Sequence, residues 1–466
     1  MTSQLFLTAA FGITAAMVAT NGVNAASKAG SKAVAQNRKP NILLILADDL
    51  GLGDLSCQYS SDMRTPNIDR LFVEGIRLDG FYANCNVSSP SRAGLLTGRY
   101  PILVGVPGVI RESYNNSHGW LSPDAVLLPQ MLSQAGYNTA HVGKWHLGLK
   151  SPNLPNERGF QYFAGFLGDM MDDYRTHMRK GNNYMRFDDQ PTEDGKGVHA
   201  TDLFTKWAMD YIDKQKDASS PFFLYLAYNA PHVPLQPPKE YENRVLAREK
   251  GISPVRAKLV AMVEQMDYNV GRIVDKLKEN GQLDNTLIIF ASDNGGYGPS
   301  ESNNGPTRGV KGDMYEGGIR VPCVFYWKNV FTPTRLNDVV MMSDIFPTLC
   351  ELAGVPVSHH IDGISVLPLL QGKKQDTGDR YLFWTKVKSH EETGEKRQTC
   401  VRYRDDKIIH ERPESPAYEY YNLKTDSMEA NTMAPSGERC ETMLAKLREH
   451  LAQGDKVPIA APGAKK

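Results

Sequence analysis

Three short runs of almost purely apolar residues constrain the fold of this chain most strongly. They cover residues 41–47, 222–227 and 286–291, and a weaker run covers residues 137–143. A strand that is buried on both faces of a parallel sheet has this continuous apolar pattern, without the alternation of a half-exposed strand. We therefore predict strands at these positions, near the centre of a mostly parallel sheet.

Helical segments are expected between these runs. The clearest one follows Ser253 as the N-cap, has Pro254 at its first helical position, and ends before Gly281. Apolar residues recur in it at steps of four and three and form a stripe along one face: Leu259, Val263, Met266, Val270, Ile273 and Leu277. Strands that alternate with helices predict an α/β fold in which helices flank a large, mostly parallel sheet.

The pattern of the chain changes beyond residue 370. Short apolar segments at 381–384, 399–403 and 407–410 are separated by polar turns, which predicts a small antiparallel sheet, and a helix is expected at 437–452. The predicted organisation is a catalytic α/β domain at 40–370, a C-terminal α+β subdomain at 371–455 and a disordered tail at 456–466.

The first 25 residues indicate export. Residues 5–19 are apolar or small, no charge precedes Lys28, and small residues that signal peptidase accepts lead up to Ala25. A membrane-anchoring helix is the alternative, but the run is short for a bilayer span, and no later segment is long and apolar enough for one. We predict a signal peptide at 1–25, a flexible leader at 26–39 and a periplasmic or secreted protein with no membrane span in the mature chain.

The overall charge limits the class of partner. Lys plus Arg and Asp plus Glu both number 53, so the formal net charge is zero and nothing indicates attraction to nucleic acid or to an anionic membrane. A negatively charged substrate would have to meet a local cluster of cations. The six cysteines have no metal-ligand spacing, and which of them might pair in an oxidising compartment is left open.

Polar residues of catalytic type follow each of the three apolar runs. The first run leads to Asp48 and Asp49, the second to His232, and the third to Asp293 and Asn294. In open α/β sheets ligands bind beyond the carboxyl ends of the strands, so these side chains are expected to converge. A single Asp after a strand is usually a turn former or a helix cap, but three runs that end in this way indicate a site.

These residues predict a metal site. Asp48, Asp49, Asp293 and Asn294 offer hard oxygen ligands without sulfur or histidine, which suits Ca²⁺ or Mg²⁺ better than zinc. Crowded carboxylates repel one another unless a divalent cation lies between them. We favour Ca²⁺ because it tolerates irregular geometry and bidentate carboxylates.

Residues 88–99 form the most specific stretch of the chain. Ser88 is expected at the N-terminus of a helix, with Pro90 in the first turn and Arg92 one turn further on. The helix dipole and the guanidinium both favour an anion bound at Ser88. Taken alone, the stretch would equally fit a serine-capped helix.

The stretch Ser88-x-Pro90-Ser91-Arg92, followed by Thr97-Gly98-Arg99, resembles the signature of the formylglycine sulfatases. Further blocks that are similar to those of this family follow in the family's order, and the match extends over most of residues 40–370: 48–54, 142–148, 231–234, 292–295 and 311–322. The resemblance implies an alkaline phosphatase-like fold and a bacterial glycan sulfatase that hydrolyses sulfate esters.

The resemblance also implies a modified residue. In this family the first residue of the signature, Cys or Ser, is oxidised to a formylglycine aldehyde whose hydrate is the nucleophile and binds Ca²⁺. Here Ser88 stands where many relatives have Cys, and Cys85 is three positions too early to replace it. In the family a serine is modified by an anaerobic radical maturation enzyme, so the resemblance implies a bacterial host that has this enzyme.

An alkyl sulfate needs a nucleophile, neutralisation of its oxygens and protonation of a poor leaving group. As the resemblance implies, Asp293 accepts the proton of the nucleophile and Arg92 orients that nucleophile. Lys144 and Lys311 hold sulfate oxygens.

The resemblance assigns the two remaining roles to histidines. His232 is the general acid on the leaving oxygen and contacts the sulfate, and His146 is the base that allows sulfate to be released. On an extended segment His146 would face the same side as Lys144, two residues before it.

The expected substrate is a sulfated sugar, such as a galactose or N-acetylgalactosamine sulfate of mucin, glycosaminoglycan or algal glycans, attacked by an exo-acting enzyme. The polar and aromatic segment 168–177 lies outside the shared blocks, and His177 in it is a candidate for contact with the sugar. One alternative is a phosphodiesterase or phosphonate hydrolase of the same fold, which generally uses transition metals with several His and Asp ligands. The other is an inactive sulfatase-like protein in which unmodified Ser88 stands among residues that bind sulfated glycans.

Overall fold

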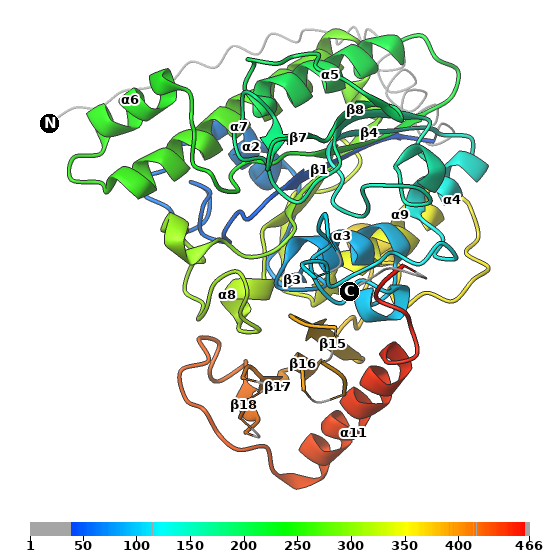
Figure 1. Cartoon of the computed structure of the whole chain (residues 1–466), viewed down its shortest axis with the longest axis vertical. Helices are drawn as coiled ribbons and strands as arrows, with labels where there is room; N and C mark the ends of the chain where they lie inside the picture. Colours follow the sequence, from blue (N-terminus) through cyan, green and yellow to red (C-terminus); the bar gives the residue numbers. More distant parts are fainter. Residues whose placement is uncertain are drawn as a thin grey trace, which may run out of the picture. The chain divides into compact units, whose positions relative to one another are not determined.

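A ten-stranded sheet forms the centre of the part of the chain that the structure describes (Figure 1). The structure is a computed structural model, and it describes residues 39–461 except 114, 391, 395, 413 and 416. The predicted signal peptide and almost all of the predicted leader lie outside the described residues. The strands occur in this order across the sheet: β13 (Thr334–Leu336), β2 (Ile76–Leu78), β12 (Cys323–Trp327), β11 (Thr286–Ser292), β1 (Asn41–Ala47), β10 (Phe222–Ala227), β4 (Asn138–Lys144), β5 (Tyr162–Phe166), β8 (Met185–Phe187) and β9 (Gln190–Pro191).

The apolar runs of the sequence are the central strands, as predicted. β11, β1, β10, β4 and β5 are adjacent and pair in parallel, whereas β12, β8 and β9 pair with their neighbours in antiparallel orientation. All residues of β10 and β11 are buried, because helices cover both faces of the sheet. The predicted α/β fold with a large, mostly parallel sheet is confirmed.

Successive residues of β1 pack into two different cores. Leu43, Ile45 and Ala47 face a core completed by α2 (Pro66–Glu74), α5 (Ala200–Lys214) and α7 (Pro254–Glu279). Residues 42, 44 and 46 face the opposite core, which is completed by α3 (Ser88–Thr97), α4 (Leu128–Gln134) and α9 (Ile345–Ala353). The alternating direction of side chains along a strand therefore separates the two helical layers, which lie on opposite sides of the sheet in Figure 1.

Helix α7 forms as the sequence predicts. The Ser253 hydroxyl accepts a hydrogen bond from the backbone N–H of Arg256 at 3.0 Å, and all six residues of the predicted stripe are buried. Helix α6 (Lys239–Arg248) precedes it.

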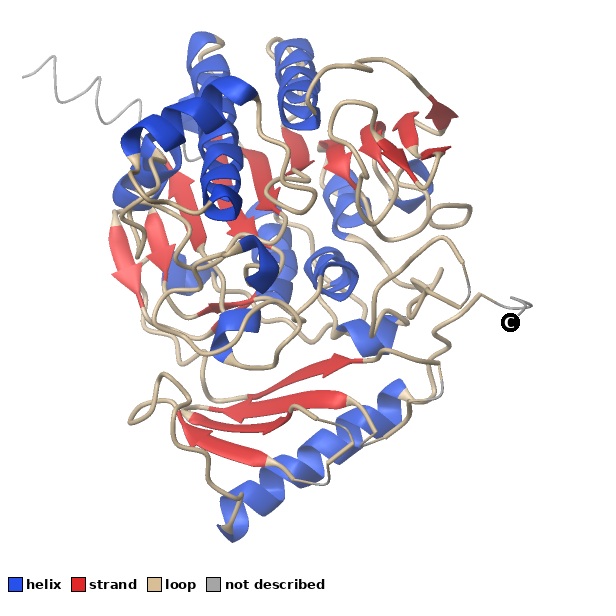
Figure 2. Ribbon diagram, turned by 60° about the vertical axis from the view of Figure 1, so that its left-hand side comes forward, coloured by secondary structure: helices blue, strands red, loops and turns tan. Residues whose placement is uncertain are grey.

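The C-terminal part contains a separate four-stranded antiparallel sheet, with a long helix beside it (Figure 2). Its strands are β15 (Tyr381–Lys386), β16 (Gln398–Tyr403), β17 (Asp406–His410) and β18 (Glu419–Asn422), and the helix is α11 (Gly437–Gly454). The predicted sheet and helix are confirmed, and β18 is an addition. Side chains of this sheet share a core with Tyr82, Met314 and Ile319, so the sheet packs on the large α/β part.

Shorter elements complete the described chain. These are β3 (Phe81–Tyr82), β6 (Met178–Arg179), β7 (Asn182–Asn183), β14 (Val340–Met341), α8 (Glu316–Ile319), α10 (Leu367–Leu370) and 3₁₀ turns at η1 (Pro101–Val104), η2 (Asn156–Arg158), η3 (Leu283–Asn285), η4 (Gly298–Ser300) and η5 (Met342–Asp344). No helix among the described residues has the length and apolarity that a membrane span requires. All six cysteines lie in described segments and each is a free thiol.

Candidate active site

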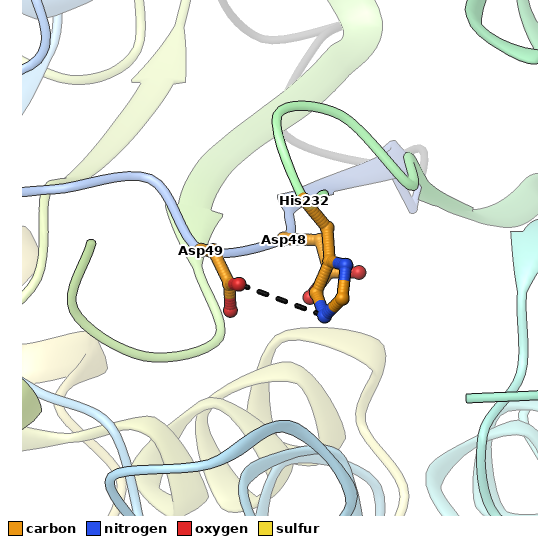
Figure 3. A group of neighbouring side chains, drawn as sticks. All are labelled: Asp48, Asp49 and His232. Carbon is orange, nitrogen blue, oxygen red and sulfur yellow. Dashed lines mark ion pairs between the residues drawn. The ribbon is translucent and has the colours of Figure 1, made fainter. Parts of the chain in front are cut away.

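The residues that follow the central strands meet at one edge of the sheet. β1 lies between β10 and β11, and the backbone N–H of Asp48 donates to the carbonyl of Ala230 while that of Asp293 donates to the carbonyl of Ala47, both at 3.1 Å. These bonds hold the segments after the three strands side by side. Figure 3 shows the result for Asp48, Asp49 and His232, whose side chains point toward one another.

Ser88 is the first residue of α3 and lies in this group. The residue is 3% exposed, and its hydroxyl is 3.1 Å from Asp48 Oδ1 and 3.3 Å from Asn294 Oδ1. Asn294 in turn donates from Nδ2 to Asp49 Oδ1 at 2.8 Å. The structure therefore brings Ser88, the predicted nucleophile position, together with two predicted metal ligands, Asp48 and Asn294, which follow strands β1 and β11.

Arg92 is fully buried one turn along α3. It donates to Asp293 Oδ2 from Nε at 3.1 Å and from Nη2 at 2.8 Å, and it donates from Nη1 to the carbonyl of Lys144 at 3.1 Å. Burial opposes the charge of Arg92, but the carboxylate of Asp293 outweighs burial and raises the pKa of Arg92 above its ordinary value. Arg92 thus holds the Asp293 carboxylate in place with two hydrogen bonds.

Two lysines lie against the two adjacent carboxylates. Lys144 donates to Asp48 Oδ2 at 2.5 Å, and Lys311 donates to Asp49 Oδ2 at 2.8 Å. Burial alone would raise the pKa of both carboxyls, but Lys144 and Lys311 outweigh it and the pKa values of Asp48 and Asp49 lie below their ordinary value. The Lys311 side chain is 18% exposed and that of Lys144 is fully buried, so Lys311 marks the side of the site that opens to solvent.

The two predicted catalytic histidines present different nitrogens to the site. His232 has Nδ1 2.7 Å from the carbonyl of Val233, so Nδ1 carries a hydrogen and Nε2 faces Asp49 Oδ2 at 3.6 Å. Burial lowers the pKa of His232, and the charge of Lys311 lowers it further. Its side chain is 11% exposed, and Nε2 lies beside Asp49, one of the predicted metal ligands.

His146 is more deeply buried and has one unused nitrogen. Its Nε2 is 3.0 Å from the carbonyl of Ile110, whereas Nδ1 is buried and has no hydrogen-bond partner among the described residues. Burial lowers the pKa of His146 well below its ordinary value, and the charge of Lys144 lowers it further. A neutral ring that donates from Nε2 keeps a lone pair on Nδ1, so His146 has the form that accepts a proton.

The metal ligands that the sequence predicts include no histidine, but His232 lies at the carboxylate cluster, where the residues after the three strands were expected to converge. Ligand atoms of Asp48, Asp49 and His232 all lie within 4.8 Å of one another. The physical reason is the topology, because β10 is adjacent to β1 and a turn closed by the His232 N–H and the Asn229 carbonyl directs the ring back toward Asp49.

The donor set fits a hard divalent cation. The carboxylates of Asp48 and Asp49 and the amide oxygen of Asn294 are gathered around Ser88, and Asp293 Oδ1 lies 3.2 Å from the backbone nitrogen of Asp49. Oxygen ligands of this kind suit Ca²⁺, and the buried negative charge that they carry needs cations beside it.

The segment 168–177 lies next to this group. The Tyr174 hydroxyl lies 2.7 Å from the carbonyl oxygens of both Asn229 and His232, and it holds the turn that carries His232. His177 is buried, and its Nε2 lies 2.9 Å from the Val198 carbonyl. Contact between His177 and a sugar stays a prediction, and in this structure the ring does not face solvent.

The sequence did not predict the side chains that hydrogen-bond to the backbone next to Lys311. The carbonyl of Gly312 accepts hydrogen bonds from three side chains that come from distant parts of the chain: Asn86 at 2.8 Å, Lys386 at 2.9 Å and Gln398 at 3.0 Å. Asn86 is two residues before Ser88, and Gln398 belongs to β16. The C-terminal sheet therefore positions both Lys311 and the start of α3, and no local pattern signals contacts over such separations.

A buried arginine, two lysines and two histidines around a serine and three carboxylates define a hydrolase of anionic esters. Residues 40–355 match the family model described as Sulfatase, and residues 310–456 match the model described as N-sulphoglucosamine sulphohydrolase, C-terminal. The chain belongs to the sulfatase family and is a sulfuric ester hydrolase.

Similar proteins agree with this assignment. The chain is 32% identical to the uncharacterized sulfatase YdeN of Escherichia coli (strain K12), over 76% of this chain and 70% of that protein. It is 32% identical to N-acetylgalactosamine-6-sulfatase of Mus musculus, over 75% of this chain and 70% of that protein. The crystal structure of Ps i-CgsB in complex with k-i-k-neocarrahexaose superposes with a TM-score of 0.81 at 31% identity and covers 90% of this chain and 94% of that chain.

Proposed function

We propose that this protein removes sulfate from a sugar with a formylglycine made from Ser88 and with Ca²⁺ held by Asp48, Asp49, Asp293 and Asn294. One observation carries the proposal. The Ser88 hydroxyl is buried at the N-terminus of α3, within 3.3 Å of side-chain oxygens from two of these residues. A helix N-terminus favours negative charge at this position.

Formylglycine would supply a hydroxyl nucleophile for the sulfur atom, and Ca²⁺ would supply charge that offsets the carboxylates. Asp293 accepts the proton that the nucleophile loses, and Arg92 holds the Asp293 carboxylate in place. With a metal held by Asp48 and Asp49, the ammonium groups of Lys144 and Lys311 would be available to bind sulfate oxygens. Cations placed where charge develops are the main source of rate enhancement in such a site.

The two histidines move protons on either side of the sulfate. In its doubly protonated form, His232 protonates the leaving sugar oxygen from Nε2, the nitrogen that faces Asp49. His146 accepts a proton at Nδ1, the nitrogen that has no partner among the described residues, and this allows sulfate to leave. Proton transfers of this kind typically contribute roughly 10²–10⁴-fold each.

Similar proteins support a sulfated carbohydrate as the substrate. Besides the N-acetylgalactosamine-6-sulfatase and Ps i-CgsB, the PsFucS1 sulfatase from Pseudoalteromonas sp. has a TM-score of 0.74 at 27% identity, and it covers 94% of this chain and 95% of that chain. Galactose or N-acetylgalactosamine sulfates of mucin, glycosaminoglycan or algal glycans, cut by an exo-acting enzyme, are the proposed class. Export to the periplasm or medium, where such glycans are found, belongs to the same proposal.

Maturation tests the proposal directly. Protein produced with a radical enzyme that oxidises serine should lose the mass of two hydrogen atoms at Ser88 and should turn over sulfated sugars. Ser88→Ala, produced in the same host, should keep its unmodified mass and be inactive. Ser88→Cys, produced with an enzyme that oxidises cysteine, should recover activity.

Full activity of unmodified Ser88 protein would contradict the mechanism. If mature protein binds sulfated glycans and turns over none of them, the alternative of an inactive binding protein is correct instead.

A further inference from the structure

A cavity of about 120 Å³ lies between the large α/β part and the C-terminal sheet. The large part contributes Tyr82 of β3 and Arg320, which directly follows α8. The C-terminal part contributes Arg402 of β16 and, at the rim, the exposed Ser427. None of the lining residues belongs to the group around Ser88, so the cavity is not part of the candidate active site.

Two arginines line this cavity without a carboxylate partner. Arg402 is 6% exposed, and it donates from Nε to the carbonyl of Arg404 at 2.7 Å and from Nη1 to the hydroxyl of Tyr82. Arg320 donates from Nε to the carbonyl of Asp79 at 2.7 Å. Among the described residues, Nη2 of Arg402 and both terminal nitrogens of Arg320 have no hydrogen-bond or ion-pair partner. These nitrogens are therefore available to a ligand in the cavity.

The carboxylates at the cavity do not neutralise the two arginines. Glu316 lines it, but its oxygens already accept hydrogen bonds from Lys407 Nζ at 2.8 Å and from the Tyr82 hydroxyl at 2.7 Å. Asp405 also lines the cavity, but it is exposed, so water solvates its charge. An arginine stays charged in a protein, and a buried charge without a counter-charge is costly. An anion in the cavity would offset this cost.

The size and the donors of the cavity indicate a small oxyanion. One water molecule needs about 10–15 Å³ of cavity space, whereas sites for larger organic ligands have about 300–1,000 Å³. A volume of about 120 Å³ therefore admits an ion with four oxygen atoms but not an oligosaccharide. The planar fork of a guanidinium group matches two oxygens of such an ion and binds them with charge-assisted hydrogen bonds.

We propose that Arg320 and Arg402 hold a tetrahedral oxyanion, inorganic sulfate or phosphate, between the large α/β part and the C-terminal sheet. The ion links β16 to the segment that follows α8 and so stabilises the packing of the sheet on the large part. The site needs neither formylglycine nor Ca²⁺, and an inactive protein would bind the ion equally well. A failure of the proposed function would therefore leave this inference intact.

Calorimetric titration of the full chain with sulfate and with phosphate, at constant ionic strength, tests the site. The protein carries Lys311→Gln, which removes a cation of the candidate active site and so weakens binding of an anion there. Addition of Arg320→Gln should weaken anion binding about tenfold or more, because it removes a charged hydrogen-bond donor. Addition of Arg244→Gln, which removes an exposed arginine of α6, is the matched control and should leave the affinity unchanged. The ion that binds more tightly is the ligand of the site.

A second variant covers the case in which Arg320→Gln does not fold. Ser427 is exposed at the rim, so Ser427→Glu adds a negative charge there without removal of a buried contact, and it should also weaken binding. Absence of binding of both ions, or an affinity that neither variant changes, would overturn the inference.

Crystals soaked in selenate, a sulfate analogue with an anomalous signal, locate the ion directly. The selenium signal should lie between the guanidinium groups of Arg320 and Arg402. A signal found only beside Ser88 would show that the candidate active site alone binds the anion, which would also overturn the inference.

Discussion

Replacement of Lys407 by methionine should destabilise the protein by about 3–5 kcal/mol, because it removes the ammonium group that two buried carboxylates share. Lys407 Nζ donates to Glu316 Oε1 at 2.8 Å and to Glu429 Oε1 at 2.7 Å, and the three side chains are at most 2% exposed. Methionine retains most of the aliphatic stem, so the cost comes from two uncompensated carboxylates and not from a cavity. Glu316 begins α8, five residues after Lys311, so the cluster also anchors a catalytic loop to the C-terminal sheet.

The loss of stability should depend on pH. Burial tends to raise the pKa of Glu316, but the charge of Lys407 outweighs it and the pKa falls to about 2, whereas the pKa of Glu429 stays above its ordinary value because burial dominates. Without Lys407, burial raises both pKa values. A carboxyl with a higher pKa in the folded than in the unfolded chain binds protons preferentially when folded, so its contribution to stability falls as pH rises. The variant should therefore be closer to the wild type at pH 5.5 than at pH 8.

Urea denaturation followed by tryptophan fluorescence at both pH values measures the two differences in free energy of unfolding. Lys278→Met, which changes an exposed lysine of α7, is the matched control and should cost little at either pH. A loss below about 1 kcal/mol at pH 8 would mean that the cluster is no more valuable than a surface ion pair. A loss that is the same at pH 5.5 and pH 8 would show that the carboxyls do not take up protons, which would refute the electrostatic account.

Three further predictions concern catalysis. His232→Ala should slow cleavage of a sugar sulfate by roughly 10²–10⁴-fold and cleavage of a nitrophenyl sulfate much less, since only the sugar alkoxide needs a proton to leave. Equal losses of activity on the two substrates would show that His232 only binds the sulfate. Ca²⁺ at about 100 times its Kd should raise the free energy of unfolding, measured by calorimetry, by about 2.7 kcal/mol, and Asp49→Asn should abolish most of this gain. The same gain in the Asp49→Asn variant would show that the ion binds elsewhere. Gln398→Ala should raise KM several-fold, because its hydrogen bond to the Gly312 carbonyl is worth about 1 kcal/mol and positions the neighbouring Lys311. An unchanged KM together with an unchanged kcat would show that Gln398 does not position Lys311.

The central strands and most of the site could be predicted from the sequence because both depend on local pattern. A strand buried on two faces must be apolar at every position, so residues 41–47 and 286–291 are distinctive wherever they occur. The residues after parallel strands meet at one sheet edge in any such fold. Asp48, Asp293 and Asn294 therefore come together near Ser88 for a reason that the strand pattern already contains.

The remaining features depend on contacts between distant segments. Gly312 lies 226 residues from Asn86 and 86 residues from Gln398, and the contact with Gln398 exists only because the C-terminal sheet packs on the large α/β part. β18 reads Glu-Tyr-Tyr-Asn, which has too few apolar residues to stand out, and it forms because β17 offers it an edge. His232 was expected at the same sheet edge, but its position directly beside Asp49 depends on the strand order, in which β10 neighbours β1.

The imidazole beside the carboxylates does not turn the site into that of a phosphodiesterase. Among the described residues, His232 is the one histidine whose ring nitrogen groups with Asp48 and Asp49, and the other nearby ring, that of His146, has Nε2 bonded to the Ile110 carbonyl. A transition-metal site of the alternative class would need several imidazoles in these positions. The groups that surround the carboxylates are instead the ammonium ions of Lys144 and Lys311. Two lysines beside these carboxylates offer positive charge to the oxygens of a sulfate that stays anionic throughout the reaction, which is the chemistry of sulfate ester cleavage.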